Sequence, residues 1–192
     1  PFLMADCLLR YMGSKLDRNK TMLQECGNFD VYAEINGPRC DDKKGCRLED
    51  GSIAVSNPGP RIFLPQHFNL EDLHDAAPNS TWLLNTRLPS AWVESVMNWS
   101  DLQHQFANEY FAQGVIDKLP ESEEEMKAFL KDIFRNHTLH VKDFVSRHPS
   151  HALIEINITD SDAGEVLARS FGLDASFWTV RNQRWKIKWQ ES

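Results

Sequence analysis

Two side chains that suit an anion lie eight residues apart, where a predicted strand passes into a predicted helix. Arg87 follows a short apolar strand predicted over 81–85, and Ser95 lies on a helix predicted to begin at Pro89. An arginine offers a planar fork of donors to a phosphate, and a serine hydroxyl adds a neutral donor. In open α/β sheets ligands bind where strands end, so this spacing predicts an anion site. Alternatively, Arg87 only caps the strand end and Ser95 is a solvated helix serine.

The sequence around this pair resembles that of a known protein family. NTRLPSAWVESVMNW, residues 85–99, resembles the "TR-x-P-x-x-W-x-x-S" segment of Golgi-type and algal sulfotransferases. CGNFDVYAEI at 26–35 and HPSHALIEINITDSDAGEVLARSFG at 148–172 resemble two further segments in the same order. The resemblance covers most of residues 20–175. It implies transfer of a sulfuryl group from 3′-phosphoadenosine 5′-phosphosulfate to a hydroxyl or amine, possibly of a carbohydrate. Arg87 and Ser95 then hold the 3′-phosphate, and no metal is needed.

One part of the family pattern is missing. The phosphosulfate-binding loop of sulfotransferases follows the first strand and carries a Lys among Gly, Thr or Ser residues. Residues 11–15, YMGSK, hold a Gly and a Lys, but no apolar strand precedes them. We therefore expect the chain to begin after that loop, as a piece of a longer protein. The alternative is a non-catalytic sulfotransferase-like module that binds a glycan or a protein. A P-loop kinase-like enzyme is disfavoured, because the chain has no G-x-x-x-x-G-K-[ST] sequence.

The resemblance also implies a general base for the acceptor. By position Glu34, near the end of a strand predicted over 28–37, is the first candidate, and Asp30 and His67 follow it. The alternative is that Glu34 is a solvated strand-end carboxylate.

The tail FWTVRNQRWKIKW is basic and aromatic. In sulfotransferases the segment after the last helix often adds phosphate contacts. The resemblance therefore makes Arg181, Arg184 and Lys186 further candidates, although the motif match in the tail is poor. Alternatively, the tail only packs its tryptophans on the domain.

Strands alternate with helices along the chain. We predict strands at 28–37, 81–85 and 151–159, and helices at 2–12, 69–77, 89–99, 100–119, 122–147 and 162–173. Asn69, Ser122 and the pair Asp160–Ser161 are the expected N-caps, and Gly172 is expected to end the last helix. This alternation predicts an α/β fold with a parallel sheet flanked by helices, in one domain spanning 1–192. The resemblance makes it the P-loop nucleoside-triphosphate-hydrolase-like sulfotransferase fold, truncated at its N-terminus. The segment 38–61 is an acceptor-facing insertion or a freely varying surface loop.

Composition excludes some classes of function. The net charge is −7 and no long basic tract occurs, which argues against generic nucleic-acid binding. No apolar run approaches the ~20 residues that span a membrane. His137 and His140 stand three residues apart on one predicted helix, but no third metal ligand is evident.

Cysteines and glycosylation sequences bear on the compartment. The four cysteines fall in the first quarter of the chain, at Cys7, Cys26, Cys40 and Cys46, and allow three disulfide pairings. The sequence Asn-x-Ser/Thr occurs five times, at Asn19, Asn79, Asn98, Asn136 and Asn157, several of them in predicted regular elements. Together these features favour a secretory-pathway lumen such as the Golgi.

Overall fold

The computed structural model describes residues 37–39 and 61–178, which belong to two compact units. Of these residues, one unit comprises 37–39, 61–84 and Leu88–Ile154, and the other comprises Asn85–Arg87 and 155–178. Several sequence predictions lie outside the described residues: the helix over 2–12, most of the strand over 28–37, the four cysteines, Asn19, Asp30, Glu34, Arg181, Arg184 and Lys186.

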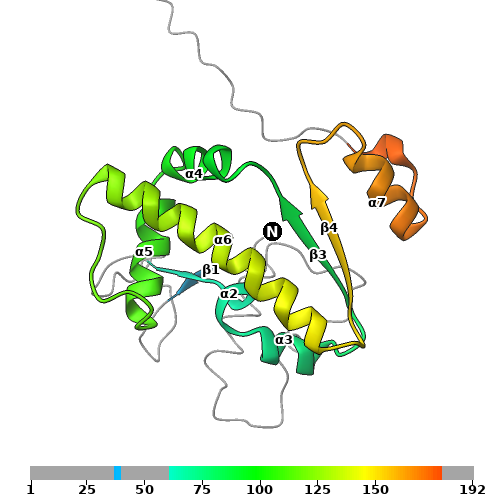
Figure 1. The fold of residues 1–192 in the computed structure, drawn as a ribbon, viewed down its shortest axis with the longest axis horizontal. Coiled ribbons are helices and arrows are strands. Elements are labelled where there is room, and N and C mark those ends of the chain that lie inside the picture. Colours follow the sequence, from blue (N-terminus) through cyan, green and yellow to red (C-terminus); the bar gives the residue numbers. More distant parts are fainter. Residues whose placement is uncertain (1–36, 40–60, 179–192) are drawn as a thin grey trace, which may run out of the picture. The chain divides into compact units, whose positions relative to one another are not determined.

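Two strands form a small parallel sheet flanked by helices (Figure 1), which confirms the α/β prediction at that level. They are β3 (Thr81–Thr86) and β4 (Ala152–Asn157). The connection between them holds the helices α4, α5 and α6, as a crossover between parallel strands requires. The strands predicted over 81–85 and 151–159 are therefore present, with ends shifted by one or two residues.

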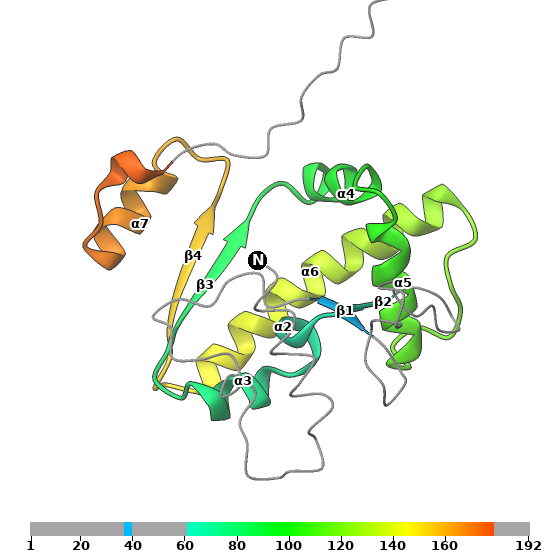
Figure 2. The ribbon, with the colours of Figure 1, turned by 180° about the vertical axis from the view of Figure 1, so that it is seen from behind.

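The helix α6 (Glu123–Arg147) is the longest element described (Figure 2). It begins where the sequence predicts, because the Ser122 hydroxyl accepts a hydrogen bond from the Glu125 N–H at 3.2 Å. Three glutamates in its first turn stabilise the helix by interacting with the positive end of its dipole. No helix in the described ranges is both long enough and apolar enough to span a bilayer.

Buried side chains of α6 belong to two apolar clusters. Towards its C-terminus, Val141, Phe144 and Val145 pack with Leu70, Leu73 and Leu84, and Trp82 and Leu153 lie against them. Towards its N-terminus, Met126, Leu130 and Ile133 pack with residues of α4 (Pro89–Met97), α5 (Leu102–Ala112) and the segment 62–64. One helix therefore supports both the sheet and the helices that precede it.

The region before β3 contains elements that the sequence did not predict. β1 (Gly37–Arg39) pairs antiparallel with β2 (Arg61–Phe63), so both ends of the predicted loop over 38–61 lie in strands. A short helix α2 (Pro65–Phe68) precedes α3 (Leu70–Ala76). Asn69 occupies the expected N-cap of α3, but its amide donates to the Asp72 carboxylate at 2.9 Å instead of capping a backbone N–H.

The helix α4 is shorter than predicted. Pro89 does occupy its first turn, but the helix ends at Met97, and Ser100 has a φ of 45°. Trp99 therefore lies beyond the helix and is 61% exposed, instead of sharing a face with Trp92 and Val96. The segment predicted as one helix over 100–119 is helical only over α5, where Phe106 and Tyr110 are buried as expected.

The second unit contains the end of β4, the helix α7 (Ala163–Phe171) and the short 3₁₀ helix η2 (Ala175–Phe177). The N-cap of α7 is Asp162, one residue after the predicted pair Asp160–Ser161. Gly172 ends α7 with a φ of 65°, a left-handed conformation in which a glycine has no Cβ to strain. The predicted end of this helix is thus confirmed.

Candidate functional site

The carboxyl ends of β3 and β4 lie side by side within the second unit. The Ile158 N–H donates to the Thr86 carbonyl at 2.9 Å, and the Thr86 hydroxyl donates to the Ile156 carbonyl at 3.3 Å. Arg87 follows Thr86 directly, so its backbone lies at this edge of the sheet. Ligands of open α/β sheets bind at such an edge, which is where the sequence predicts an anion site.

Arg87 is half-buried at this edge. Partial burial lowers the pKa of its guanidinium, which stays protonated because a free arginine titrates far above neutral pH. Among the described residues, none forms a hydrogen bond or an ion pair with this guanidinium. No described residue therefore occupies its donors, and an anion can accept from them.

The loop from β4 to α7 is shaped by its own side chains. The Asn157 side-chain carbonyl accepts from the Thr159 N–H at 3.1 Å and from the Thr159 hydroxyl at 2.7 Å. The Asn157 amide donates to the Asp160 carboxylate at 2.9 Å. These three bonds fix the loop that connects the end of β4 to α7.

Gly164 allows a close approach of Trp178 to α7. A Cβ placed on Gly164 would lie 2.6 Å from the Trp178 Cβ and 2.8 Å from its Cγ. We expect Gly164→Ala to destabilise α7 by about 1–3 kcal/mol, as overpacking does, which exceeds the gain of up to about 1 kcal/mol in helix propensity. Hydrogen exchange of the α7 amides measures this, with the exposed Ser170→Ala as the control. Unchanged protection of α7 in Gly164→Ala would contradict the steric argument.

Ser95, the other member of the predicted pair, is half-buried on α4. It belongs to the first unit, whereas Arg87 belongs to the second. Their pairing on one phosphate therefore stays a prediction from the sequence.

The third candidate base, His67, has a packing role in the structure. Its Nδ1 shares a hydrogen bond of 2.7 Å with the Tyr110 hydroxyl, and its ring stacks on that of His137 at 3.9 Å between centroids. Burial, with His137 and His140 nearby, holds the pKa of His67 well below its usual value. His67 is thus a neutral, half-buried side chain that packs against other rings. Within the described ranges no three His, Cys, Asp or Glu side chains are grouped as metal ligands, and His137 and His140 are no exception.

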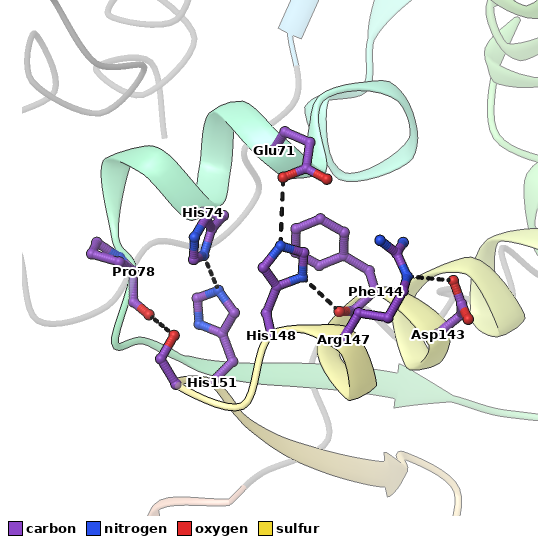
Figure 3. Close-up of polar contacts among 9 residues, drawn as sticks. Glu71, His74, Pro78, Asp143, Phe144, Arg147, His148 and His151 are labelled. Carbon is purple, nitrogen blue, oxygen red and sulfur yellow. Dashed lines mark hydrogen bonds and ion pairs between the residues drawn. The ribbon is translucent and has the colours of Figure 1, made fainter.

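A second group of histidines connects α3, the end of α6 and the start of β4 (Figure 3). His74 Nδ1 lies 2.9 Å from His151 Nε2, and His148 Nε2 lies 3.6 Å from the Glu71 carboxylate. Beside them, Ser150 donates a hydrogen bond to the Pro78 carbonyl, and Arg147 pairs with Asp143 one turn earlier on α6 at 3.1 Å. No spacing in the sequence indicates this group, because its histidines lie up to 77 residues apart.

The acceptors around these histidines determine which nitrogens carry protons. A backbone carbonyl only accepts, so His151 Nδ1 donates to the Ser80 carbonyl at 3.1 Å and His148 Nδ1 donates to the Phe144 carbonyl at 2.8 Å. In neutral His151, Nε2 is then an acceptor, and His74 Nδ1 donates to it. Burial and the neighbouring His74 and His148 lower the pKa of His151, against the opposing effect of the Ser80 carbonyl. The hydrogen bonds of this group therefore join α3, the end of α6 and the start of β4.

A shallow hollow of about 190 Å³ lies beside this group, lined by α2, α3 and α6 with Glu71, His140 and Arg147 at its wall. Pockets for small molecules usually measure about 300–1,000 Å³. The hollow is thus smaller than a nucleotide requires, and its mixed charges favour no ligand of one sign. The strand ends at Arg87 are the stronger candidate.

Comparison of the chain with family models, with curated proteins and with solved structures found no match in any of the three.

Proposed function

We propose that this chain is a sulfotransferase-like domain that binds 3′-phosphoadenosine 5′-phosphosulfate and transfers its sulfuryl group to a hydroxyl or amine, possibly of a carbohydrate. The finer fold proposed with it is the P-loop nucleotide-binding fold of sulfotransferases. The observation that carries the proposal is Arg87, which follows a parallel strand directly and has no carboxylate partner among the described residues. A non-catalytic module of the same fold predicts instead that a local carboxylate neutralises Arg87.

In the proposed reaction the acceptor oxygen or nitrogen attacks the sulfur of the phosphosulfate. The bond from sulfur to the bridging oxygen breaks, and 3′-phosphoadenosine 5′-phosphate leaves. A base takes the proton that the acceptor loses, and Glu34 is the proposed base. Arg87 contributes charge-assisted hydrogen bonds to the 3′-phosphate, and Ser95 contributes a neutral one. Arg181 and Arg184 are proposed as additional phosphate contacts.

Calorimetric titration with 3′-phosphoadenosine 5′-phosphate tests this proposal. Arg87→Ala is expected to weaken binding by about 10- to 100-fold, because a charge-assisted hydrogen bond contributes about 1.5–3 kcal/mol. Arg87→Lys should recover only part of the affinity, since an ammonium lacks the planar fork of donors. Ser95→Ala should weaken binding less than Arg87→Ala, because a neutral hydrogen bond contributes only about 0.5–1.5 kcal/mol.

Arg169→Ala is the matched control, since Arg169 is an exposed arginine of α7 in the same unit. It should leave the affinity unchanged. The titration is run on this chain and on the full product of its reading frame, because no segment of this sequence matches the phosphosulfate-binding loop of sulfotransferases. Absence of binding to both would refute the enzyme proposal and favour the non-catalytic module. Equal affinity of Arg87→Ala and the unaltered chain would remove Arg87 from the site.

A further inference from the structure

Acceptor sequences for asparagine-linked glycans are frequent in this chain. Five of its 12 asparagines begin an Asn-x-Ser/Thr sequence. Serine and threonine together make up only 20 of the 192 residues, so about one such sequence is expected by chance. Four of the five acceptor asparagines lie among the described residues, at Asn79, Asn98, Asn136 and Asn157. The structure separates these four by what their side chains do.

Two of the four use their amide groups to hold the fold. The Asn98 amide donates to the Glu94 carbonyl at 2.7 Å and so helps to end α4. Asn157 is held at both ends of its amide by Thr159 and Asp160. The nitrogen that would accept a sugar is thus already hydrogen bonded in both residues.

Asn136 is exposed, but it lies in the interior of α6. Helices form within about 0.1–1 μs from local contacts alone. Since α6 has its own N-cap at Ser122 and an ion pair between Glu123 and Lys127, its backbone is already favoured to be helical in the growing chain. A helical backbone keeps this sequence out of the extended conformation.

Asn79 differs from the other three. It lies exposed in the turn between α3 and β3, and its side chain makes no hydrogen bond within the part of the chain that the structure describes. Its neighbours are held by residues far along the chain: Pro78 accepts from Ser150, and Ser80 from His151. The Asn79 side chain is therefore exposed to solvent, while the turn around it is fixed.

The same long-range contacts determine when this turn closes. The partners of Pro78 and Ser80 lie 72 and 71 residues later in the sequence. At a synthesis rate of about 5–20 residues per second, that length of chain takes roughly 4–14 s to emerge. During that time β3 lacks its partner strand β4, and the sequence Asn79-Ser80-Thr81 stays unpaired. It is thus accessible before folding and exposed after it.

We propose that Asn79 is the glycosylated asparagine among the described sites, in preference to Asn136, when the chain enters a lumen that holds a lipid pyrophosphate-linked oligosaccharide and its transferase. In this step Nδ2 of Asn79 bonds to the anomeric carbon of the first sugar. The bond from that carbon to the pyrophosphate oxygen breaks, the lipid pyrophosphate leaves, and the amide loses one proton. The native fold accommodates the glycan, because Asn79 faces solvent. Glycosylation does not depend on nucleotide binding at Arg87, so the two proposals are tested independently.

The test directs the full chain into the secretory pathway of a eukaryotic host by a signal peptide. A C-terminal Asn-Gly-Thr tag reports that the chain has reached the lumen. Glycosidase cleavage in heavy-oxygen water followed by peptide mass spectrometry gives the occupancy of each site without requiring a folded sample. We expect occupancy at Asn79 to exceed that at Asn136 several-fold. Asn79→Gln should remove one glycan from the intact mass, and the control Asn136→Gln should remove none.

The proposal is overturned if the tag is glycosylated while Asn79 is unmodified. Equal occupancy of Asn79 and Asn136, or a higher occupancy of Asn136, also overturns it, because the folding-time argument predicts the opposite order.

Discussion

Replacement of Phe144 by alanine is expected to lower the free energy of unfolding by about 3–5 kcal/mol, the range typical of a buried phenylalanine. The Phe144 side chain is 1% exposed on α6 and belongs to the apolar cluster that joins α6 to α3 and β3. Its ring also lies against Trp82, at 5.4 Å between centroids, and stacks on His148 at 4.1 Å. Its removal leaves a cavity that α3, β3 and α6 all border.

Urea unfolding followed by circular dichroism measures this loss. Leu139→Ala is the matched control, because Leu139 lies on the same helix and is 59% exposed. We expect the control to change stability by less than about 0.5 kcal/mol, as surface substitutions do. Phe144→Leu keeps most of the buried apolar surface and should lose less than Phe144→Ala. A loss below about 1 kcal/mol in Phe144→Ala would mean that the cluster collapses around the cavity or that the ring is not buried.

The long elements were predictable because their signals are local. The helix over 122–147 carries its own cap at Ser122 and an apolar stripe, and it was predicted almost to the residue. The strand β4 and the glycine that ends α7 were predictable for the same reason, since apolar runs and a left-handed Gly172 need no distant partner. The alternation of these elements then predicted the parallel sheet.

Short or paired elements were not predictable in this way. β1 and β2 have three residues each, too few to show an alternating pattern, and each is a strand only because the other pairs with it. The predicted end of α4 was wrong by two residues. The apolar spacing of Trp92, Val96 and Trp99 continues past Met97, where the helix ends, shortly before the positive φ at Ser100. Periodicity indicates a face only while the helix lasts.

The same distinction between local and long-range signals applies to the candidate site. The place of Arg87 at the end of a strand follows from its immediate neighbours, so the sequence predicts it. The histidine group of His74, His148 and His151 depends on contacts between residues that are up to 77 positions apart, and no spacing in the sequence indicates it. His67 is a candidate base from the sequence, whereas its contacts with Tyr110 and His137 depend on the fold and have no signal in the sequence.

Acidification from pH 7 to pH 4 is expected to remove several kcal/mol of stability through His67 and His137. Both rings are half-buried and stacked on each other, and burial lowers the pKa of His137 to about 4 and that of His67 well below its usual value. His137 Nδ1 is also buried without a hydrogen-bond partner among the described residues, so a second proton on this ring would have no acceptor. The charged form is therefore disfavoured in the native state.

The sign of the effect follows from these lowered pKa values. An unfolded histidine titrates near pH 6.5, so below that pH the unfolded chain binds protons that the native chain does not. The stability is fully present above pH 6.5 and is lost as the pH falls toward 4. For His137 a shift from 6.5 to about 4 corresponds to about 3 kcal/mol at pH 4. The carboxylates add their own dependence at the lower end of this range.

A variant separates the histidine effect from that of the carboxylates. His137→Phe keeps a ring to stack on His67 but cannot bind a proton, so its stability should fall less steeply between pH 6.5 and 4, by about 1.4 kcal/mol per pH unit for one proton. His104→Gln is the control, because His104 is exposed on α5 outside this pair, and its slope should match that of the unaltered chain. Urea unfolding at half-unit steps of pH gives both slopes. If His137→Phe and the unaltered chain lost stability in parallel, His137 would have to be protonated at no cost, and the stacked, buried arrangement of the two histidines would be wrong.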